Sequence, residues 1–217
     1  MNRCKAFCNT LALLVVISFI AVIPQQIFAQ TEKGIELYNS GRYQEAERVF
    51  REALKANSAA NYYLGLSMLQ QKKSSEALDI FLEVKHSQDR TEQGARPPVP
   101  SEYQIQLALG RARLGLDQYD EAWKNIELAR IEDGTSSEVF MYRGVYYLQQ
   151  KKHAEAIKEL EKAISLDENN AYAYYYAGLA RYAMGNGKMA AEDLGTFIKL
   201  APNAPEVEKA KEVRNVC

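Results

Sequence analysis

Residues 137–166 read SEVFMYRGVYYLQQKKHAEAIKELEKAISL, and this stretch decides the fold. Residues 137–148 are expected to form a first helix with Ser137 as its N-cap. The polar turn 150–152 leads to a second helix from about 153 to 166, where apolar residues recur at helical spacing. Lysine and glutamate fill the outer face of this second helix. The stretch therefore predicts two helices joined by a short turn.

The spacing of small residues in this stretch recurs along the chain. A glycine is followed twelve residues later by an alanine and sixteen residues later by a large apolar residue, in the sets Gly34/Ala46/Phe50, Gly65/Ala77/Phe81, Gly110/Ala122/Ile126, Gly144/Ala156/Leu160 and Gly178/Ala190/Leu194. The glycines are 31, 45, 34 and 34 residues apart. A fixed period near 34 indicates a solenoid of paired helices, in which the small residues let two helices cross closely.

Two segments depart from the period. The 45-residue gap contains the Pro-rich segment 87–100, which is expected to be a loop. This loop could be a hinge, a partner-binding flap or a tolerated insertion. Residues 204–216 are expected to form a charged capping helix with Val207, Ala210 and Val213 facing inward.

The pattern resembles the tetratricopeptide repeat (TPR) family over about residues 31–202. The glycines and alanines above carry the resemblance, together with Leu64, Leu109, Tyr43, Tyr119 and Pro202. It implies an all-α fold, a right-handed α-solenoid of about five helix–turn–helix repeats with a C-terminal capping helix. The predicted TPR domain spans 30–217, with repeats at about 31–57, 58–88, 101–135, 137–169 and 171–202.

The N-terminal segment 1–29 has the features of a secretory signal peptide. Arg3 and Lys5 precede an apolar run from Leu11 to Ile23, and Ala29 stands at the expected cleavage site. We therefore predict an exported, periplasmic protein. The alternative is an uncleaved inner-membrane anchor formed by residues 6–23, although the run is short for a membrane span. Of the three cysteines only Cys217 would remain after cleavage, so no internal disulfide is expected.

Charge and composition argue against several functions. Cleavage after Ala29 would leave 25 basic and 28 acidic side chains, a balance too near neutral to favour nucleic acid as a partner. Only two histidines, His86 and His153, are present. They supply neither a zinc-ligand set nor a Cys/His dyad. No catalytic, cofactor or metal site is predicted, nor is a small-molecule substrate.

The repeat register also predicts a binding surface. By resemblance, first helices line the concave face, and their inward stripe lies six and three residues before each glycine and one and four after it. The predicted partner-binding residues are Tyr62, Leu66, Leu69, Leu107, Arg111, Met141, Val145, Tyr172, Tyr175, Leu179 and Tyr182. No lysine or asparagine stands three before or one after any of the five glycines. This argues against the clamp with which some family members grip acidic C-termini.

These features predict a non-catalytic scaffold or adaptor. It would bind a protein, as an extended peptide or an amphipathic helix, in the concave groove. By the family and the signal peptide together, it would act in bacterial envelope, pilus or secretion-complex assembly. The alternative is a structural protein that self-associates as a homo-oligomer through its terminal repeats.

Overall fold

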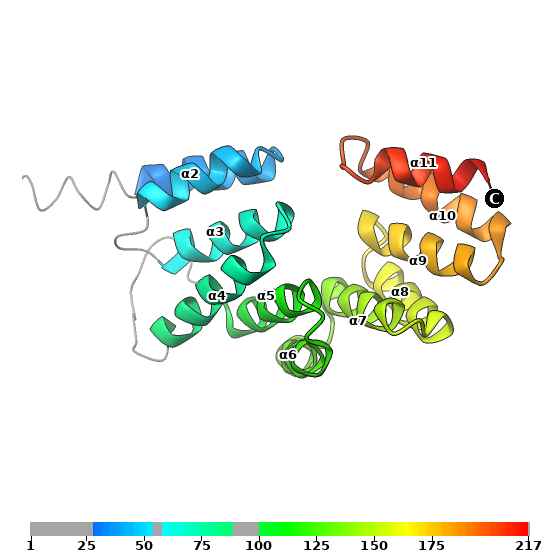
Figure 1. The fold of residues 1–217 in the computed structure, drawn as a ribbon, viewed down its shortest axis with the longest axis horizontal. Helices are drawn as coiled ribbons and strands as arrows, with labels where there is room; N and C mark the ends of the chain where they lie inside the picture. Colours follow the sequence, from blue (N-terminus) through cyan, green and yellow to red (C-terminus); the bar gives the residue numbers. More distant parts are fainter. Residues whose placement is uncertain (1–27, 54–57, 89–99, 217) are drawn as a thin grey trace, which may run out of the picture. The chain divides into compact units, whose positions relative to one another are not determined.

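A computed structural model describes residues 28–53, 58–88 and 100–216. Within these ranges the chain forms helices joined by turns and no strand (Figure 1), which confirms the predicted all-α repeat fold. It divides into two compact units, residues 1–101 and residues 102–217, and each is considered by itself below. The single domain predicted for 30–217 stays a prediction.

Three of the predicted features fall largely outside the described residues. These are the signal peptide at 1–29, of which only the last two residues are described, most of the loop at 87–100, and Cys217. At the start of that loop Ser87 and Gln88 are helical instead, because α4 continues through them. Among the helices that are described, none has the length and hydrophobicity needed to cross a bilayer.

The described part of the first unit contains two helix pairs. Residues 28–39 are helical, and the further helices are α2 (Tyr43–Ala53), α3 (Ser58–Gln70) and α4 (Ser74–Gln88). Helix α3 packs against both α2 and α4. Phe50 and Phe81 are fully buried in this unit, as the predicted apolar position of each second helix requires.

The second unit contains three helix pairs and a final single helix. Its helices are α5 (Glu102–Leu114), α6 (Tyr119–Glu132), α7 (Ser137–Gln149), α8 (His153–Leu166), α9 (Ala171–Ala183), α10 (Gly187–Leu200) and α11 (Val207–Asn215). The first helices α5, α7 and α9 are neighbours, and each packs against the second helix that follows it. The last helix, α11, packs on α10 through the buried Val207 and Ala210 and the half-buried Val213, the inward residues predicted for the cap.

The glycines mark the points where the two helices of a pair touch. A methyl group built on Gly144 would lie 2.5 Å from Cγ of Leu160, and one on Gly178 would lie 2.7 Å from Cγ of Leu194. Both leucines are fully buried, so neither side chain can move into solvent. The glycine and the apolar residue sixteen positions later therefore contact each other. Because glycine has no side chain, the large apolar side chain fits against its backbone.

The turn inside each pair also repeats. The residue seven positions after each repeat glycine has a positive φ: 77° at Gly41, 61° at Lys72, 57° at Asp117, 57° at Lys151 and 77° at Gly185. A left-handed residue directly after a helix lets the following amides bond back to the last carbonyls. In the second repeat the amide of Lys73 accordingly donates to the carbonyl of Met68 at 3.0 Å.

The junction between the fourth and fifth repeats corrects the expected cap of α7. Ser136, not Ser137, is the N-cap residue. The Ser137 hydroxyl instead donates to the carbonyl of Ala163 at 2.8 Å and accepts from the side-chain amide of Asn170 at 2.8 Å. Asn170 also caps α9 by accepting from the amide of Ala173. These bonds join the end of α8 to the starts of α7 and α9.

Half-buried Arg143 and buried Arg181 link the second helices of successive repeats. Arg143 on α7 pairs with Glu127 on α6 and, at 2.8 Å, with Glu159 on α8, and its guanidinium lies 4.8 Å from the ring centroid of Trp123. Arg181 on α9 likewise pairs with Glu161 on α8, at 2.7 Å, and with Asp193 on α10. Charge pairing therefore supplements apolar packing between these repeats.

Candidate partner-binding face

The candidate site is the surface of the neighbouring helices α5, α7 and α9 in the second unit, called the first-helix face below. Helices α6, α8 and α10 pack behind it, one against each first helix (Figure 1). The spacing between repeats places equivalent residues of the three helices side by side. Residues from different repeats can therefore contact a single partner.

The eleven predicted binding residues differ widely in exposure. Five are buried, namely Tyr62, Leu66, Leu107, Met141 and Tyr175. Five are half-buried, namely Leu69, Arg111, Val145, Tyr172 and Leu179, and Tyr182 is 44% exposed. The buried five offer little surface to a partner, and the binding role of the other six stays a prediction. Tyr62, Leu66 and Leu69 belong to the first unit, and the other eight belong to the second.

Tyr175 shows why some residues of the predicted stripe belong to the hydrophobic core. Its ring lies 4.9 Å from that of Phe197 and 5.2 Å from that of Tyr176, measured between centroids. Burial raises the pKa of its phenol to about 12, because the phenolate would lose hydration. Tyr175 therefore stabilises the packing of α9 on α10.

Tyr172 has a structural contact with the C-terminal cap. Its hydroxyl donates to Oε2 of Glu206 at 2.8 Å, and its ring lies 5.6 Å from that of Phe197. Glu206 directly precedes α11. Tyr172 thus fixes the start of the capping helix. Its ring is half-buried, so part of it remains accessible on the first-helix face.

Three residues converge on the first-helix face from three successive repeats. The guanidinium of Arg111 on α5 lies 5.0 Å from the ring centroid of Tyr142 on α7. The charge of Arg111 also acts on the phenol of Tyr176 on α9. Burial raises the pKa of this phenol, and the nearby carboxylate of Glu206 raises it further. Arg111 lowers it, because a positive charge favours the phenolate. Each of the three side chains is half-buried. The face therefore has a cationic and aromatic centre, and Val145 and Leu179 are half-buried apolar residues of the same face.

Of this centre, the predicted stripe contained Arg111 but neither Tyr142 nor Tyr176. The sequence did contain a signal for them, because a tyrosine stands two residues before the repeat glycine at Tyr63, Tyr142 and Tyr176. In the first unit Tyr63 stacks on Phe50 with centroids 6.0 Å apart and contacts Tyr38 edge-on. The same register position is therefore aromatic and in contact with a preceding helix in both units.

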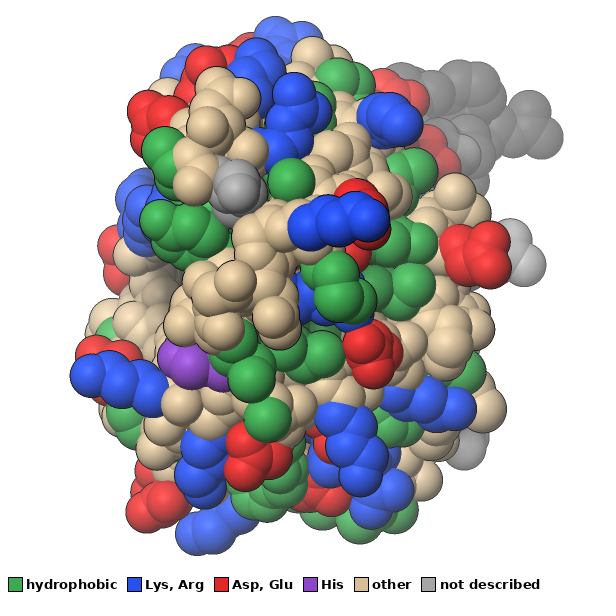
Figure 2. All heavy atoms as spheres, turned by 90° about the vertical axis from the view of Figure 1, so that its right-hand side faces the viewer, with side chains coloured by type: hydrophobic (Ala, Val, Ile, Leu, Met, Phe, Trp, Pro, Cys, Tyr) green, Lys and Arg blue, Asp and Glu red, His purple; other side chains and the backbone are tan. Residues whose placement is uncertain are grey.

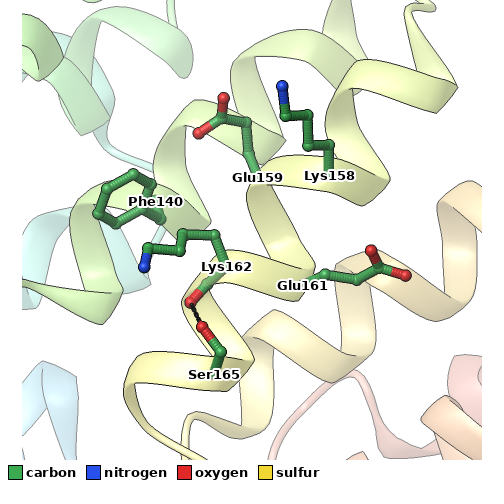
Figure 3. A pocket seen from close by; sticks show the side chains of 6 residues that line it. All are labelled: Phe140, Lys158, Glu159, Glu161, Lys162 and Ser165. Atoms are coloured by element: carbon green, nitrogen blue, oxygen red, sulfur yellow. Dashed lines mark hydrogen bonds between the residues drawn. The ribbon is translucent and has the colours of Figure 1, made fainter.

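A second surface is formed mainly by the second helix α8. A pocket of about 430 Å³ is lined by Phe140 of α7 and by five residues of α8, namely Lys158, Glu159, Glu161, Lys162 and Ser165 (Figure 3). Elsewhere acidic and basic side chains are interspersed, as on the face drawn in Figure 2. Within the described ranges, no three His, Cys, Asp or Glu side chains are grouped so that they could hold a metal ion.

Family models and solved structures agree on the class of this fold. Models of the tetratricopeptide repeat match residues 31–95 and 172–204, and a model of the TPR repeat matches residues 144–185. The chain belongs to the tetratricopeptide repeat family, whose repeats are non-catalytic protein-interaction modules.

Several solved TPR structures are similar in fold. A thermophilic TPR protein of Thermus thermophilus is 18% identical with a TM-score of 0.70, over 88% of this chain and 98% of that one. MamA of Desulfovibrio magneticus RS-1 is 16% identical with a TM-score of 0.53, over 82% and 97%. The first TPR domain of Spaghetti (RPAP3), bound to an HSP90 peptide, is 22% identical with a TM-score of 0.50, over 53% and 94%. At these identities the likeness concerns the fold.

Proposed function

We propose that this chain is a non-catalytic scaffold that holds a peptide or a helix of another protein on the first-helix face of its second unit. The contact of Arg111 on α5 with the ring of Tyr142 on α7 carries the proposal, and the effect of Arg111 on the phenol of Tyr176 on α9 supports it. Tyrosine and arginine are enriched at interface positions that contribute most to affinity. They combine a large contact area with directed hydrogen-bond donors.

The packing of these residues favours binding without a large rearrangement. Each is partly held by neighbours within the repeats, so little side-chain entropy is lost when a partner contacts it. Half-buried Val145 and Leu179 would contribute apolar area beside the charged centre. The peptide complex of the RPAP3 domain supports this use of a TPR fold, since that domain is similar to about half of this chain.

The cellular setting is proposed from the N-terminal sequence. A positively charged start, an apolar run and Ala29 favour export to the periplasm. There the scaffold would serve the assembly of an envelope, pilus or secretion complex. An uncleaved anchor would place the same repeats at the inner membrane.

The proposal is tested by capturing partners from an envelope extract with the full-length protein. Arg111→Gln removes the charge of the centre and Val145→Glu places a carboxylate beside it, while Lys188→Gln changes an exposed residue on α10 as the control. We expect the first two variants to lose a protein that the wild type and the control both recover. Equal recovery of every protein by all four would contradict the proposal, provided that circular dichroism shows them equally helical.

A further inference from the structure

The pocket beside Phe140 contains charged residues of both signs, but their roles differ. Glu159 receives two hydrogen bonds from Arg143, at 2.8 and 3.2 Å, and both side chains are 15% exposed. Glu161 accepts from Arg181 at 2.7 Å and points away from Phe140 in Figure 3. Both carboxylates of the pocket are therefore paired with arginines of the adjacent first helices and not with its lysines.

The two lysines of the pocket have no carboxylate partner among the described residues. Lys158 and Lys162 are exposed, and neither joins an ion pair in the part of the chain that the structure describes. Lys162 extends toward Phe140, with its Nζ 6.0 Å from the ring centroid (Figure 3). Because the two glutamates are paired with arginines, the pocket presents two ammonium groups without an ion-pair partner among the described residues, beside a half-buried aromatic ring.

The repeat register extends this surface onto α6. The residues 34 positions before Lys158, Lys162 and Ser165 are Lys124, Leu128 and Ile131. Leu128 is 44% exposed and Ile131 is 68% exposed, among the few large apolar side chains so exposed in the described residues. Because α6 and α8 occupy equivalent places in successive repeats, these positions lie on the same side of the second unit. Lys124 is exposed as well.

From this arrangement we infer that the outward side of α6 and α8 is a second docking surface, formed by Lys124, Leu128, Ile131, Phe140, Lys158 and Lys162. Its occupant is an amphipathic segment of another protein that carries carboxylates beside apolar side chains. The lysines pair with those carboxylates, and the exposed apolar residues cover the apolar stripe of the segment. This surface is separate from the first-helix face, so a scaffold using both could hold two partners at once.

The inference is tested with a synthetic peptide of eighteen residues that has leucines on one helical face and glutamates on the other. An otherwise identical peptide with glutamines in place of the glutamates is the charge control. Binding of each to the full-length protein is measured by fluorescence anisotropy. We expect the glutamate peptide to bind more tightly, and Lys158→Gln/Lys162→Gln to weaken it about tenfold. Leu128→Ser/Ile131→Ser should weaken both peptides.

Matched variants separate this surface from its neighbours. Glu121 and Glu155 are exposed residues one turn before Lys124 and Lys158, so Glu121→Gln/Glu155→Gln should strengthen binding of the glutamate peptide. Arg111→Gln should leave it unchanged, since it alters only the first-helix face. Equal affinity for the two peptides, or loss of binding in Arg111→Gln but not in the lysine variant, would overturn the inference. The latter result would leave the proposed function of the first-helix face standing.

Discussion

Replacing the glycine at a helix crossing should destabilise the protein, although alanine is the better helix former. In Gly144→Ala the new methyl group would lie 2.5 Å from Cγ and 2.8 Å from Cδ2 of Leu160. Leu160 is fully buried, so the helices must separate or its side chain must leave its preferred rotamer. Overpacking of this kind costs roughly 1–3 kcal/mol.

A second glycine provides the matched control. Gly195 lies inside α10, and a methyl group there would meet nothing nearer than Nη1 of Arg214 at 3.8 Å. Gly195→Ala should therefore show the helix-propensity gain alone, a stabilisation of about 0.5–1 kcal/mol. The same gain offsets part of the overpacking in Gly144→Ala, which leaves a net loss of up to about 2.5 kcal/mol. Because both variants share the propensity gain, their stabilities should differ by the overpacking cost, about 1–3 kcal/mol.

Urea unfolding of the full-length protein measures this difference. Circular dichroism follows all helices, and fluorescence follows Trp123, whose ring on α6 lies 4.7 Å from that of Tyr146 on α7. Two probes are needed because repeat proteins can unfold in parts. Leu160→Ala should cost less in the Gly144→Ala background than alone, since the methyl fills part of the cavity. A Gly144→Ala protein as stable as Gly195→Ala would refute the crossing argument.

Three further predictions concern pH, charge and processing. Burial raises the pKa of Tyr175 from 10.0 to about 12, so its contribution should be intact below pH 10 and fall by up to about 3 kcal/mol as the pH rises from 10 to 12. Urea midpoints over this range should fall less steeply for Tyr175→Phe, and identical slopes would contradict the assignment. Arg143→Leu should lower the free energy of unfolding by about 3 kcal/mol, because it leaves the carboxylates of Glu127 and Glu159 without this partner. Adding Glu127→Gln and Glu159→Gln should restore most of that stability. No recovery in the triple variant would show that unpaired carboxylates are not the cause. Mass spectrometry of the mature protein should find Gln30 at its N-terminus, whereas Met1 in a membrane fraction would favour the anchor.

The helix pairs could be predicted because close helix crossings need small residues at fixed spacing. The glycine and the residue sixteen positions later are in contact in every repeat, so one short pattern carried the register of the whole chain. The left-handed turn residue was harder to foresee. Glycine reveals it at Gly41 and Gly185, but Lys72, Asp117 and Lys151 adopt the same conformation without that signal.

The binding stripe was harder to predict because a single helix does not show what its neighbours cover. The residues three before the glycines were placed on the concave face, yet Tyr62, Leu107, Met141 and Tyr175 are all buried. These residues pack against the second helix of their own repeat, as Tyr62 does on Phe81 and Tyr175 on Phe197. Two residues before the glycine, Tyr142 and Tyr176 are only half-buried; Tyr142 contacts Arg111, and the charge of Arg111 acts on the phenol of Tyr176.

Contacts over longer separations were also beyond helical periodicity. Arg143 and Arg181 each join carboxylates of two different second helices, and no helix pattern relates those residues. The same pairs decide the character of the pocket beside Phe140, because they engage Glu159 and Glu161 and leave its two lysines without a carboxylate partner among the described residues. This difference between its glutamates and lysines therefore emerged only from the packing of three helices.

Photocrosslinking in living cells tests most directly whether the first-helix face holds a partner. A photoreactive amino acid at Val145 or Leu179 lies on that face beside the cationic and aromatic centre, whereas the same group at the exposed Glu192 of α10 serves as the control. The account predicts that one protein is trapped from both face positions and not from position 192, and that Arg111→Gln diminishes its capture. Trapping of that protein from position 192 alone, or no trapping from either face position, would contradict it.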